Sequence, residues 1–242
     1  MIPIGDDNSD RERWPVITAA LVIANFLVFL YELSVANQGD YALQEFIQKW
    51  AAVPRDYFTH HRPGGGVPYW TTLFTSMFLH GGWGHLLGNM LYLWIFGDNV
   101  EDRFGRFAFI IFYLAAGVAG GLTQIMASGP SNLPLVGASG AIAGVLGAYV
   151  FMFPTKRVRI FAYLFVFEVP AFVVIGLWAL TQLLNGFGSL GARVASDSGG
   201  VAYLAHVGGF AAGIVGALAW RLVAGVPSRR YPPRRRSPWE GY

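Results

Sequence analysis

The sequence predicts an all-α, polytopic membrane protein built as a bundle of six membrane-spanning helices. Three observations support this fold class: a composition poor in charge, six apolar stretches in succession, and an uneven distribution of positive residues. Of the 242 residues, 54% are hydrophobic and only 13% are charged, whereas a soluble domain carries about 25% charged residues. The missing charge indicates that most of the outer surface faces lipid rather than water.

Six apolar stretches follow one another along the chain. They cover residues 15–35, 83–98, 107–127, 137–153, 169–187 and 202–224. A membrane-spanning helix needs roughly 20 apolar residues, so the second and fourth stretches are slightly short. Four of the stretches contain glycines at G-x-x-x-G spacing: Gly84/Gly88, Gly117/Gly121, Gly140/Gly144 and Gly209/Gly213. This spacing lets membrane helices approach closely, although any single pair can also arise by chance in a glycine-rich helix.

The positive residues give the orientation. If the N-terminus is cytoplasmic and six helices alternate, 13 of the 17 Lys and Arg residues fall in cytoplasmic segments and 4 fall outside. Cytoplasmic loops of membrane proteins are enriched in Lys and Arg. Both termini are therefore expected in the cytoplasm.

The chain is expected to divide into three parts. Residues 1–14 form a cytoplasmic segment, residues 15–224 the six-helix domain, and residues 225–242 a basic, Pro-rich cytoplasmic tail. A secretory signal peptide begins with positive charge, whereas acidic residues precede the first apolar stretch here. The tail is expected to lie at an anionic membrane surface rather than to bind nucleic acid. The sequence contains no organelle-targeting segment or additional helix, which favours a bacterial plasma membrane.

The first outside loop, residues 36–82, is too long to be a simple connection. Within Tyr41–Val53, apolar residues recur at helical spacing with polar residues between them, which predicts an amphipathic helix lying in the membrane interface. The run Pro63–Gly66 then predicts a flexible break. On the cytoplasmic side, Glu168-Val169-Pro170 is expected to mark the start of the fifth helix.

Two histidines and an asparagine around the start of the second stretch are candidates for a polar site. Ionisable residues in membrane helices are costly and therefore mark functional sites. His85 and Asn89 are four residues apart and share one helical face, whereas His80 precedes His85 by five residues, a poor spacing for a shared metal ion. No carboxylate completes a zinc motif of the H-E-x-x-H kind, and the chain has no cysteine. The alternative is that His85 and Asn89 are polar side chains that bridge helices.

Ser139 and His206 lie at the starts of two further stretches. Ser139, in Gly137-Ala138-Ser139-Gly140, follows a loop and opens an apolar helix. It is either an ordinary N-cap or a hydroxyl beside free backbone N–H groups that could hold an oxyanion. His206 is flanked by small residues and could instead be hydrogen-bonded between helices.

Topology brings these residues to one depth. The second, fourth and sixth helices would all enter from the outside, so His85, Asn89, Ser139 and His206 should lie just below the outer surface. A serine, a histidine and further hydrogen-bond donors are the groups that acyl transfer requires.

At these residues the chain resembles the rhomboid intramembrane serine proteases. Three motifs carry the resemblance: His80-x4-His85-x3-Asn89, Gly137-x-Ser139-Gly140 and Ala205-His206-x-x-Gly209-x3-Gly213. The resemblance covers residues 15–224 and implies a six-helix rhomboid-like bundle that cleaves membrane-spanning helices of other proteins. It implies that Ser139 and His206 form a catalytic dyad, that His85, Asn89 and the backbone at Gly137 and Ser139 stabilise the oxyanion, and that His80 supports them. No metal or cofactor is expected.

One position departs from the family pattern. Four residues after the serine, an aromatic ring often supports the histidine, but here that residue is Ala143. Tyr203 and Phe210 are the candidates to replace it. Trp178 could line a lateral opening to the lipid, but it could equally be a lipid-facing packing residue, and it is left out of the predicted site.

Two other functions are compatible with the same features. A rhomboid-like protein without protease activity would bind or escort membrane proteins, although such relatives usually lack the serine or the histidine, and both are present here. A small transporter or channel would line its pathway with His and Asn, but the acidic residues lie mostly outside the predicted spans. The protease is therefore the leading hypothesis, with membrane-spanning substrates and the lipid bilayer as its partners.

Overall fold

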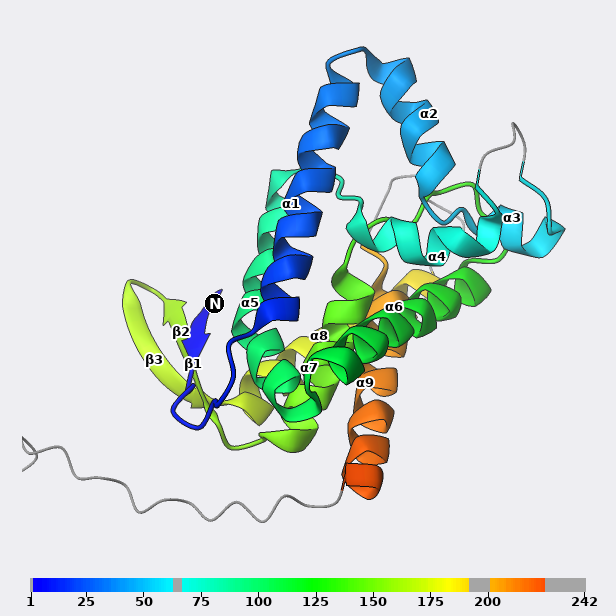
Figure 1. The fold of residues 1–242 in the computed structure, drawn as a ribbon. Helices are drawn as coiled ribbons and strands as arrows, with labels where there is room; N and C mark the ends of the chain where they lie inside the picture. The colour runs from blue at the N-terminus through cyan, green and yellow to red at the C-terminus, as the bar shows by residue number, and fades with distance from the viewer. Residues whose placement is uncertain (1, 63–66, 192–200, 225–242) are drawn as a thin grey trace, which may run out of the picture.

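The computed structural model describes residues 2–62, 67–191 and 201–224. Each predicted apolar stretch corresponds to one long helix (Figure 1): α1 (Val16–Ala36), α5 (Trp83–Phe104), α6 (Arg106–Ser128), α7 (Ser139–Met152), α8 (Ala171–Gly191) and α9 (Tyr203–Ala224). Among the described residues, α1, α6, α8 and α9 are long and apolar enough to cross a membrane. The predicted break at residues 63–66 and the basic tail lie outside the described residues.

The shorter helix α7 is the centre of the bundle. Its residues from Gly140 to Tyr149 are all buried, and it packs against α5, α6 and α9. The closest contact is with α9, because a methyl group on Gly209 would overlap the carbonyl of Gly140, and one on Gly213 would overlap the carbonyl of Gly144. These two predicted glycine pairs therefore face each other across one helix–helix interface.

The other two glycine pairs behave differently. Gly117 and Gly121 of α6 lie against the side chains of Met77 and Leu73, so they accommodate the connection that precedes α5. A Cβ on Gly84 or on Gly88 would have no neighbour within 4 Å among the described residues, and the expectation of a close helix contact is wrong for that pair.

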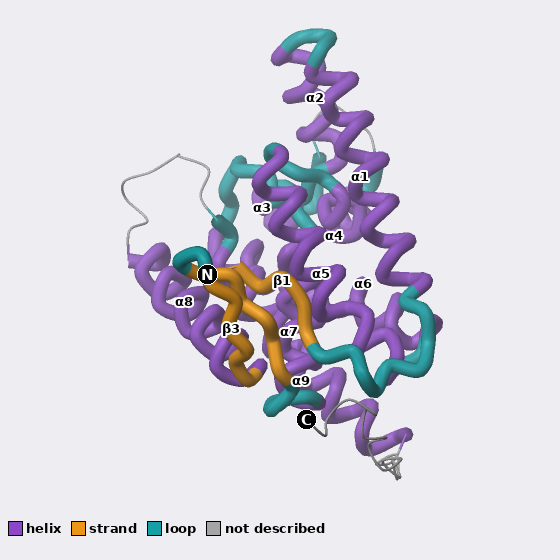
Figure 2. The backbone as a smooth tube through the Cα atoms, turned by 90° about the vertical axis from the view of Figure 1, so that its left-hand side faces the viewer, coloured by secondary structure: helices purple, strands orange, loops and turns teal. Residues whose placement is uncertain are grey.

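The prediction of an all-α fold needs one correction, because a three-stranded antiparallel sheet lies beside the bundle (Figure 2). Its strands are β1 (Ile2–Asp6), β2 (Arg157–Ala162) and β3 (Phe165–Pro170), in the order β1-β2-β3. Glu168-Val169-Pro170 therefore ends a strand, and α8 begins only at Ala171. In β2, Val158, Ile160 and Ala162 are buried while the residues between them are exposed, which is the period of a strand with one face covered.

The hairpin lacks the usual turn residues. The turn between β2 and β3 consists of Tyr163 and Leu164, with φ angles of 50° and 72°. Two consecutive left-handed residues make the turn that suits a two-residue hairpin, but Asn and Gly normally occupy it. The absence of that signal explains why the sequence did not predict the strands.

The long first connection contains the predicted amphipathic helix. It comprises α2 (Asp40–Trp50), α3 (Pro54–Thr59), η1 (Tyr69–Thr71), α4 (Thr72–Thr75) and η2 (Ser76–Phe78). Phe46 of α2 packs edge-on against Tyr31 of α1, with ring centroids 5.5 Å apart. The connection joins the loop after α6 through a bridge between Ala52 and Leu135, so two segments predicted on the outside meet at one end of the bundle.

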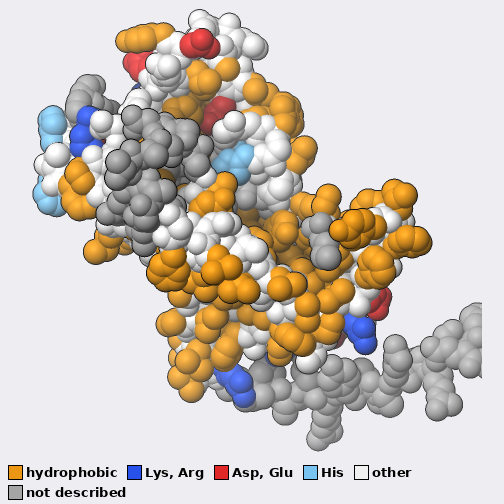
Figure 3. All heavy atoms as spheres, turned by 180° about the vertical axis from the view of Figure 1, so that it is seen from behind, with side chains coloured by type: hydrophobic (Ala, Val, Ile, Leu, Met, Phe, Trp, Pro, Cys, Tyr) orange, Lys and Arg blue, Asp and Glu red, His pale blue; other side chains and the backbone are white. Residues whose placement is uncertain are grey.

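The segments predicted on the inside meet at the other end. Arg11 pairs with Asp98 at the end of α5 at 2.6 Å, and Lys156 after α7 pairs with Asp10 at 2.6 Å. The carboxylate of Glu101 accepts hydrogen bonds from the backbone N–H groups that begin α1. Between the two ends, hydrophobic side chains cover the helical body on the face seen in Figure 3, with few charged side chains among them.

Candidate functional site

His80, His85 and Asn89 assemble where α5 begins. The Nδ2 of Asn89 donates a hydrogen bond of 3.0 Å to Nε2 of His80, and Nδ1 of His80 lies 3.3 Å from the carbonyl oxygen of Phe78. A carbonyl only accepts, so the proton of His80 resides on Nδ1. The backbone N–H of His80 donates to the buried Glu32 of α1 at 3.1 Å. His80 is thereby fixed from three sides and in turn fixes the amide of Asn89.

The His85 ring lies 5.1 Å from the His80 ring and is exposed at the surface. It faces the backbone of Gly137, because a Cβ there would lie 2.7 Å from Cε1 of His85 and 3.7 Å from Nδ2 of Asn89. The φ angle of Gly137 is 121°, a conformation that residues with side chains rarely adopt. Two separate constraints therefore require glycine at this position.

Ser139 is the first residue of α7, two residues after Gly137. Its side chain is partly exposed, whereas the neighbouring Ala138 and Gly140 are buried. The first backbone N–H groups of a helix have no partner inside the helix, so α7 offers such donors next to the Ser139 hydroxyl. The loop leading to Ser139 is held by the Gly137 N–H, which donates to the carbonyl of Ser76 at 2.9 Å.

His206 lies in the first turn of α9 and is buried. Its Nδ1 lies 2.8 Å from Oε1 of Gln182 on α8, and its ring lies against the indole of Trp178, with centroids 5.8 Å apart. Sequence reasoning named Tyr203 or Phe210 as the supporting aromatic and left Trp178 out. The structure instead places Trp178 against His206, and Phe210 packs on Trp178 at 6.2 Å.

Ser139 and His206 both adjoin the α7–α9 interface. Gly140, the residue after Ser139, lies beside the carbonyl oxygen of Ala205, the residue before His206. Both side chains therefore emerge next to the same close helix contact. Within the described part of the chain, the hydrogen bond of the His206 ring uses Nδ1, which leaves Nε2 to accept a proton.

Gln182 and Gln124 are two further polar residues that the sequence reasoning did not select. The Oε1 of Gln124 on α6 accepts hydrogen bonds from the backbone N–H groups of Leu204 and Ala205, at 3.1 and 3.2 Å. It therefore caps the helix that carries His206. Both glutamines lie in apolar stretches, and a polar side chain inside a membrane helix is the same signal that selected His85 and Asn89.

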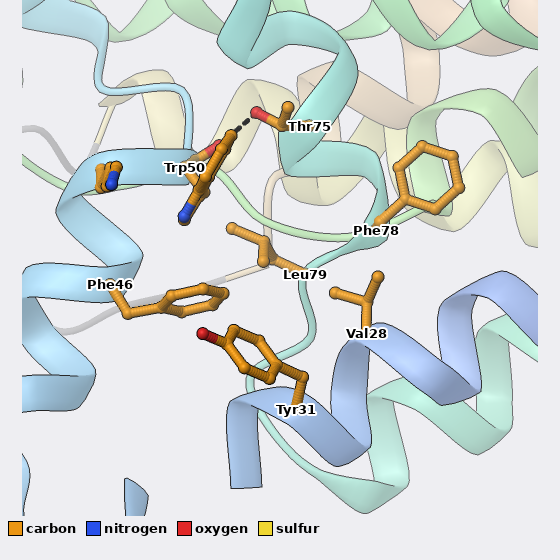
Figure 4. Close-up of a pocket in the computed structure, with 8 residues that line it drawn as sticks. Val28, Tyr31, Phe46, Trp50, Thr75, Phe78 and Leu79 are labelled. Carbon is orange, nitrogen blue, oxygen red and sulfur yellow. Dashed lines mark hydrogen bonds between the residues drawn. The ribbon is translucent and has the colours of Figure 1, made fainter. Parts of the chain in front are cut away.

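A separate apolar cavity of about 420 Å³ lies between α1, α2 and η2 (Figure 4). Its lining comprises Val28, Tyr31, Phe46, Lys49, Trp50, Thr75, Phe78 and Leu79. No predicted site residue lines it, although Leu79 immediately precedes His80. In the described parts of the chain, no group of three or more His, Cys, Asp or Glu side chains could hold a metal ion. The polar cluster around Ser139 is thus the candidate site, and its groups are suited to acyl transfer.

Comparison with known proteins gives consistent matches. A family model described as a rhomboid domain matches residues 68–223. The chain is 30% identical to the mitochondrial rhomboid protein 1 of Saccharomyces cerevisiae, covering 85% of this chain and 56% of that protein. It is 33% identical to the rhomboid protease GluP of Bacillus subtilis, over 62% of this chain and 26% of that protein. It is 27% identical to the chloroplastic rhomboid-like protein 11 of Arabidopsis thaliana, over 80% and 65%. The chain thus spans less than two-thirds of the length of each of these relatives.

Proposed function

The chain belongs to the rhomboid family, and from this premise we propose that it is an intramembrane serine endopeptidase. It would hydrolyse peptide bonds in or near the membrane-spanning helices of other membrane proteins. The observation that carries the proposal is the meeting of α5, α7 and α9 at one place. There Ser139 opens α7 directly before Gly140, which lies beside the Ala205 carbonyl that precedes His206, and the His85 and Asn89 side chains of α5 face Gly137, two residues before Ser139.

The reaction follows from these groups. The Ser139 Oγ attacks the carbonyl carbon of the peptide bond while Nε2 of His206 takes the hydroxyl proton. The negative charge that develops on the carbonyl oxygen is held by the Ser139 backbone N–H, Asn89 and His85. His206 then returns the proton to the leaving amine as the C–N bond breaks, and an acyl-enzyme remains. Water, deprotonated by His206, attacks the ester, and the carboxylic acid leaves as Ser139 recovers its proton.

The position of the site in the bundle supports a membrane setting for this reaction. Polar, irregular backbone at membrane depth is tolerated only where it lines a water-filled cavity or is buried in protein. His85 is exposed and Ser139 is partly exposed, so water has a route to the reacting atoms. We propose six spans, both termini in the cytoplasm and the site open toward the outer face, in agreement with the 13 cytoplasmic and 4 outside Lys and Arg residues of that arrangement.

A bacterial plasma membrane is our proposal for the location. Relatives include proteins described as mitochondrial and chloroplastic, so fractionation of the producing cell is the direct measurement. Protease accessibility of tags at the two ends would test the orientation.

The test of function uses the purified chain in liposomes with a panel of fluorescent membrane-spanning substrates. Wild type, Ser139→Ala and His206→Ala are compared, with Ser34→Ala and His61→Ala as controls at exposed positions. Cleavage by wild type and both controls, lost in the two site variants, supports the protease. A fluorophosphonate probe covers the case in which the panel lacks a substrate, because it should label wild type and not Ser139→Ala.

The second candidate is a binding or escort protein without protease activity. Several relatives carry only the description rhomboid-like, which is the observation in its favour. Folded wild-type protein that neither cleaves any substrate nor reacts with the probe would favour this function over the protease.

A further inference from the structure

Gln182 is the hydrogen-bonding partner that the structure gives the His206 ring. Its Oε1 lies 2.8 Å from Nδ1 of His206, and both side chains are buried. The contact joins α8 to α9 through two residues that are 24 positions apart in the sequence. None of the three sequence motifs that define the predicted site includes a residue of α8.

The direction of this hydrogen bond follows from the other end of the amide. The Nε2 of Gln182 lies 3.4 Å from the carbonyl oxygen of Trp178 and 3.1 Å from the hydroxyl of Thr181. A carbonyl oxygen can only accept, so the NH₂ group faces Trp178 and the amide oxygen faces the histidine. Oε1 must therefore accept a proton from Nδ1 of His206. That proton position leaves Nε2 unprotonated in the neutral ring.

Trp178 restrains the same ring in a second way. It lies one helical turn before Gln182 on α8, so the two side chains share a face. The indole lies at 34° to the imidazole plane, which supports the ring while the amide holds its edge. Ala143 provides no ring from α7, and the pair on α8 supplies the support from the opposite helix.

We propose, on the premise that the chain is the serine endopeptidase described above, that Gln182 is a positioning residue for His206. It holds the imidazole in the tautomer and rotation that let Nε2 accept the Ser139 proton. Ser-His-Asp triads use a carboxylate for this purpose. Here a neutral amide does so, without placing a charge among apolar helices.

The experiment compares Gln182→Leu and Gln182→Glu with the matched control Asn185→Leu, which removes an exposed amide from the same helix. General-base catalysis contributes about 10²–10⁴-fold; we expect Gln182→Leu to forfeit part of this and lower kcat about 10- to 100-fold. KM should change by less than about twofold, since the amide does not contact substrate. Asn185→Leu should match wild type.

Gln182→Glu separates positioning from packing. A carboxyl group still offers an oxygen to Nδ1, so kcat should stay within about threefold of wild type on the alkaline plateau. Once ionised, it favours the protonated imidazole, and the acidic limb of the kcat/KM profile should move to higher pH. In the part of the chain that the structure describes, His85 of α5 is the other titratable group acting on His206, and it is unchanged in all variants. Wild-type kcat in Gln182→Leu, or equal losses in Gln182→Leu and Gln182→Glu with an unmoved acidic limb, would overturn the proposal.

A second measurement does not depend on activity. In protein labelled with ¹⁵N-histidine, with His206→Ala for assignment, the His206 ring of wild type should carry its proton on Nδ1. In Gln182→Leu this preference should be lost. If wild type fails to cleave or to react with the probe, the protease proposal fails, while the ring tautomer still decides the role of Gln182. A proton on Nε2 in wild type would refute it.

Discussion

Gly209→Ala is the most direct perturbation of the interface that joins Ser139 to His206. The added methyl group would lie 2.9 Å from the Gly140 carbonyl carbon and closer still to its oxygen. Both atoms belong to backbone, so no side chain can turn away and the helices must separate. Overpacking of this kind costs about 1–3 kcal/mol, which is roughly 2–4 °C in Tm for each kcal/mol in a protein of this size.

The cleavage rate of Gly209→Ala should be affected more strongly than its thermal stability. A displacement of about 1 Å at reacting groups costs on the order of 100-fold in rate, and α9 carries His206 one turn before Gly209. The matched control is Gly176→Ala on α8, where an added Cβ meets no described residue within 4 Å. Because alanine favours helix over glycine by about 1 kcal/mol, this control should be neutral or slightly more stable. The assays are thermal unfolding in detergent and cleavage of the same fluorescent substrate. Equal Tm and equal cleavage rates for the two variants would refute the argument that this backbone contact sets the distance between the two groups.

Three other perturbations test the parts around this interface. Gly137→Ala should reduce cleavage at least about 100-fold with a smaller loss of stability, because its φ of 121° and the His85 ring both exclude a side chain; the fluorescent-substrate assay measures the first effect and Tm the second. Glu101→Gln should destabilise the fold by roughly 1–3 kcal/mol, since the carboxylate accepts hydrogen bonds from two N–H groups that begin α1; unfolding in detergent measures this. Burial raises the pKa of Asp6 from 3.8 to about 6, opposed by a hydrogen bond from Tyr149. The folded state thus binds the proton more tightly, so the contribution of protonated Asp6 to the docking of β1 is full below pH 4 and is lost as pH rises through 6. Hydrogen-exchange protection of residues 2–6, taken relative to the intrinsic exchange rate at each pH, should fall across this range, and Asp6→Asn should remove that fall.

The sequence predicted the helices because bilayer thickness imposes a length and a polarity on each span. The positions of α1, α6, α8 and α9 follow from apolar runs alone. The end of α5 does not follow from an apolar run, because the helix continues to Phe104 through charged residues. These charged residues contact the N-terminal segment, as in the ion pair between Arg11 and Asp98. The sheet was missed because its pairing joins residues 2–6 to residues 157–162, and such distant pairing leaves only a short alternating pattern in either segment.

The candidate site, like the fold, could be predicted only in part from the sequence. Alternation of the helices across the membrane was enough to expect His85, Asn89, Ser139 and His206 at one depth. It could not give the rotation of α8, which decides whether Trp178 and Gln182 face the bundle or the lipid. An aromatic residue and an amide in an apolar stretch satisfy either orientation, and only the packed structure places both against His206.

The two buried histidines share a feature that connects the fold to the chemistry. Each imidazole is held by a side-chain amide: His80 by Asn89 and His206 by Gln182. The two hydrogen bonds run in opposite directions, since the Asn89 amide donates to His80 whereas the Gln182 amide accepts from His206. A buried carboxylate in place of Gln182 would have to be ionised to act as in a soluble triad, and an isolated charge in a low-dielectric interior is costly. An amide supplies the same hydrogen bond while both partners stay neutral. The imidazolium that forms during acyl transfer then lacks a fixed counter-charge on α8, and its stabilisation must come from the oxyanion formed in the same step. We therefore expect the two positions to be coupled: replacing Gln182 by Glu should lessen the loss of activity caused by Asn89→Ala, because a charge on α8 would then stabilise the imidazolium when the oxyanion is poorly held.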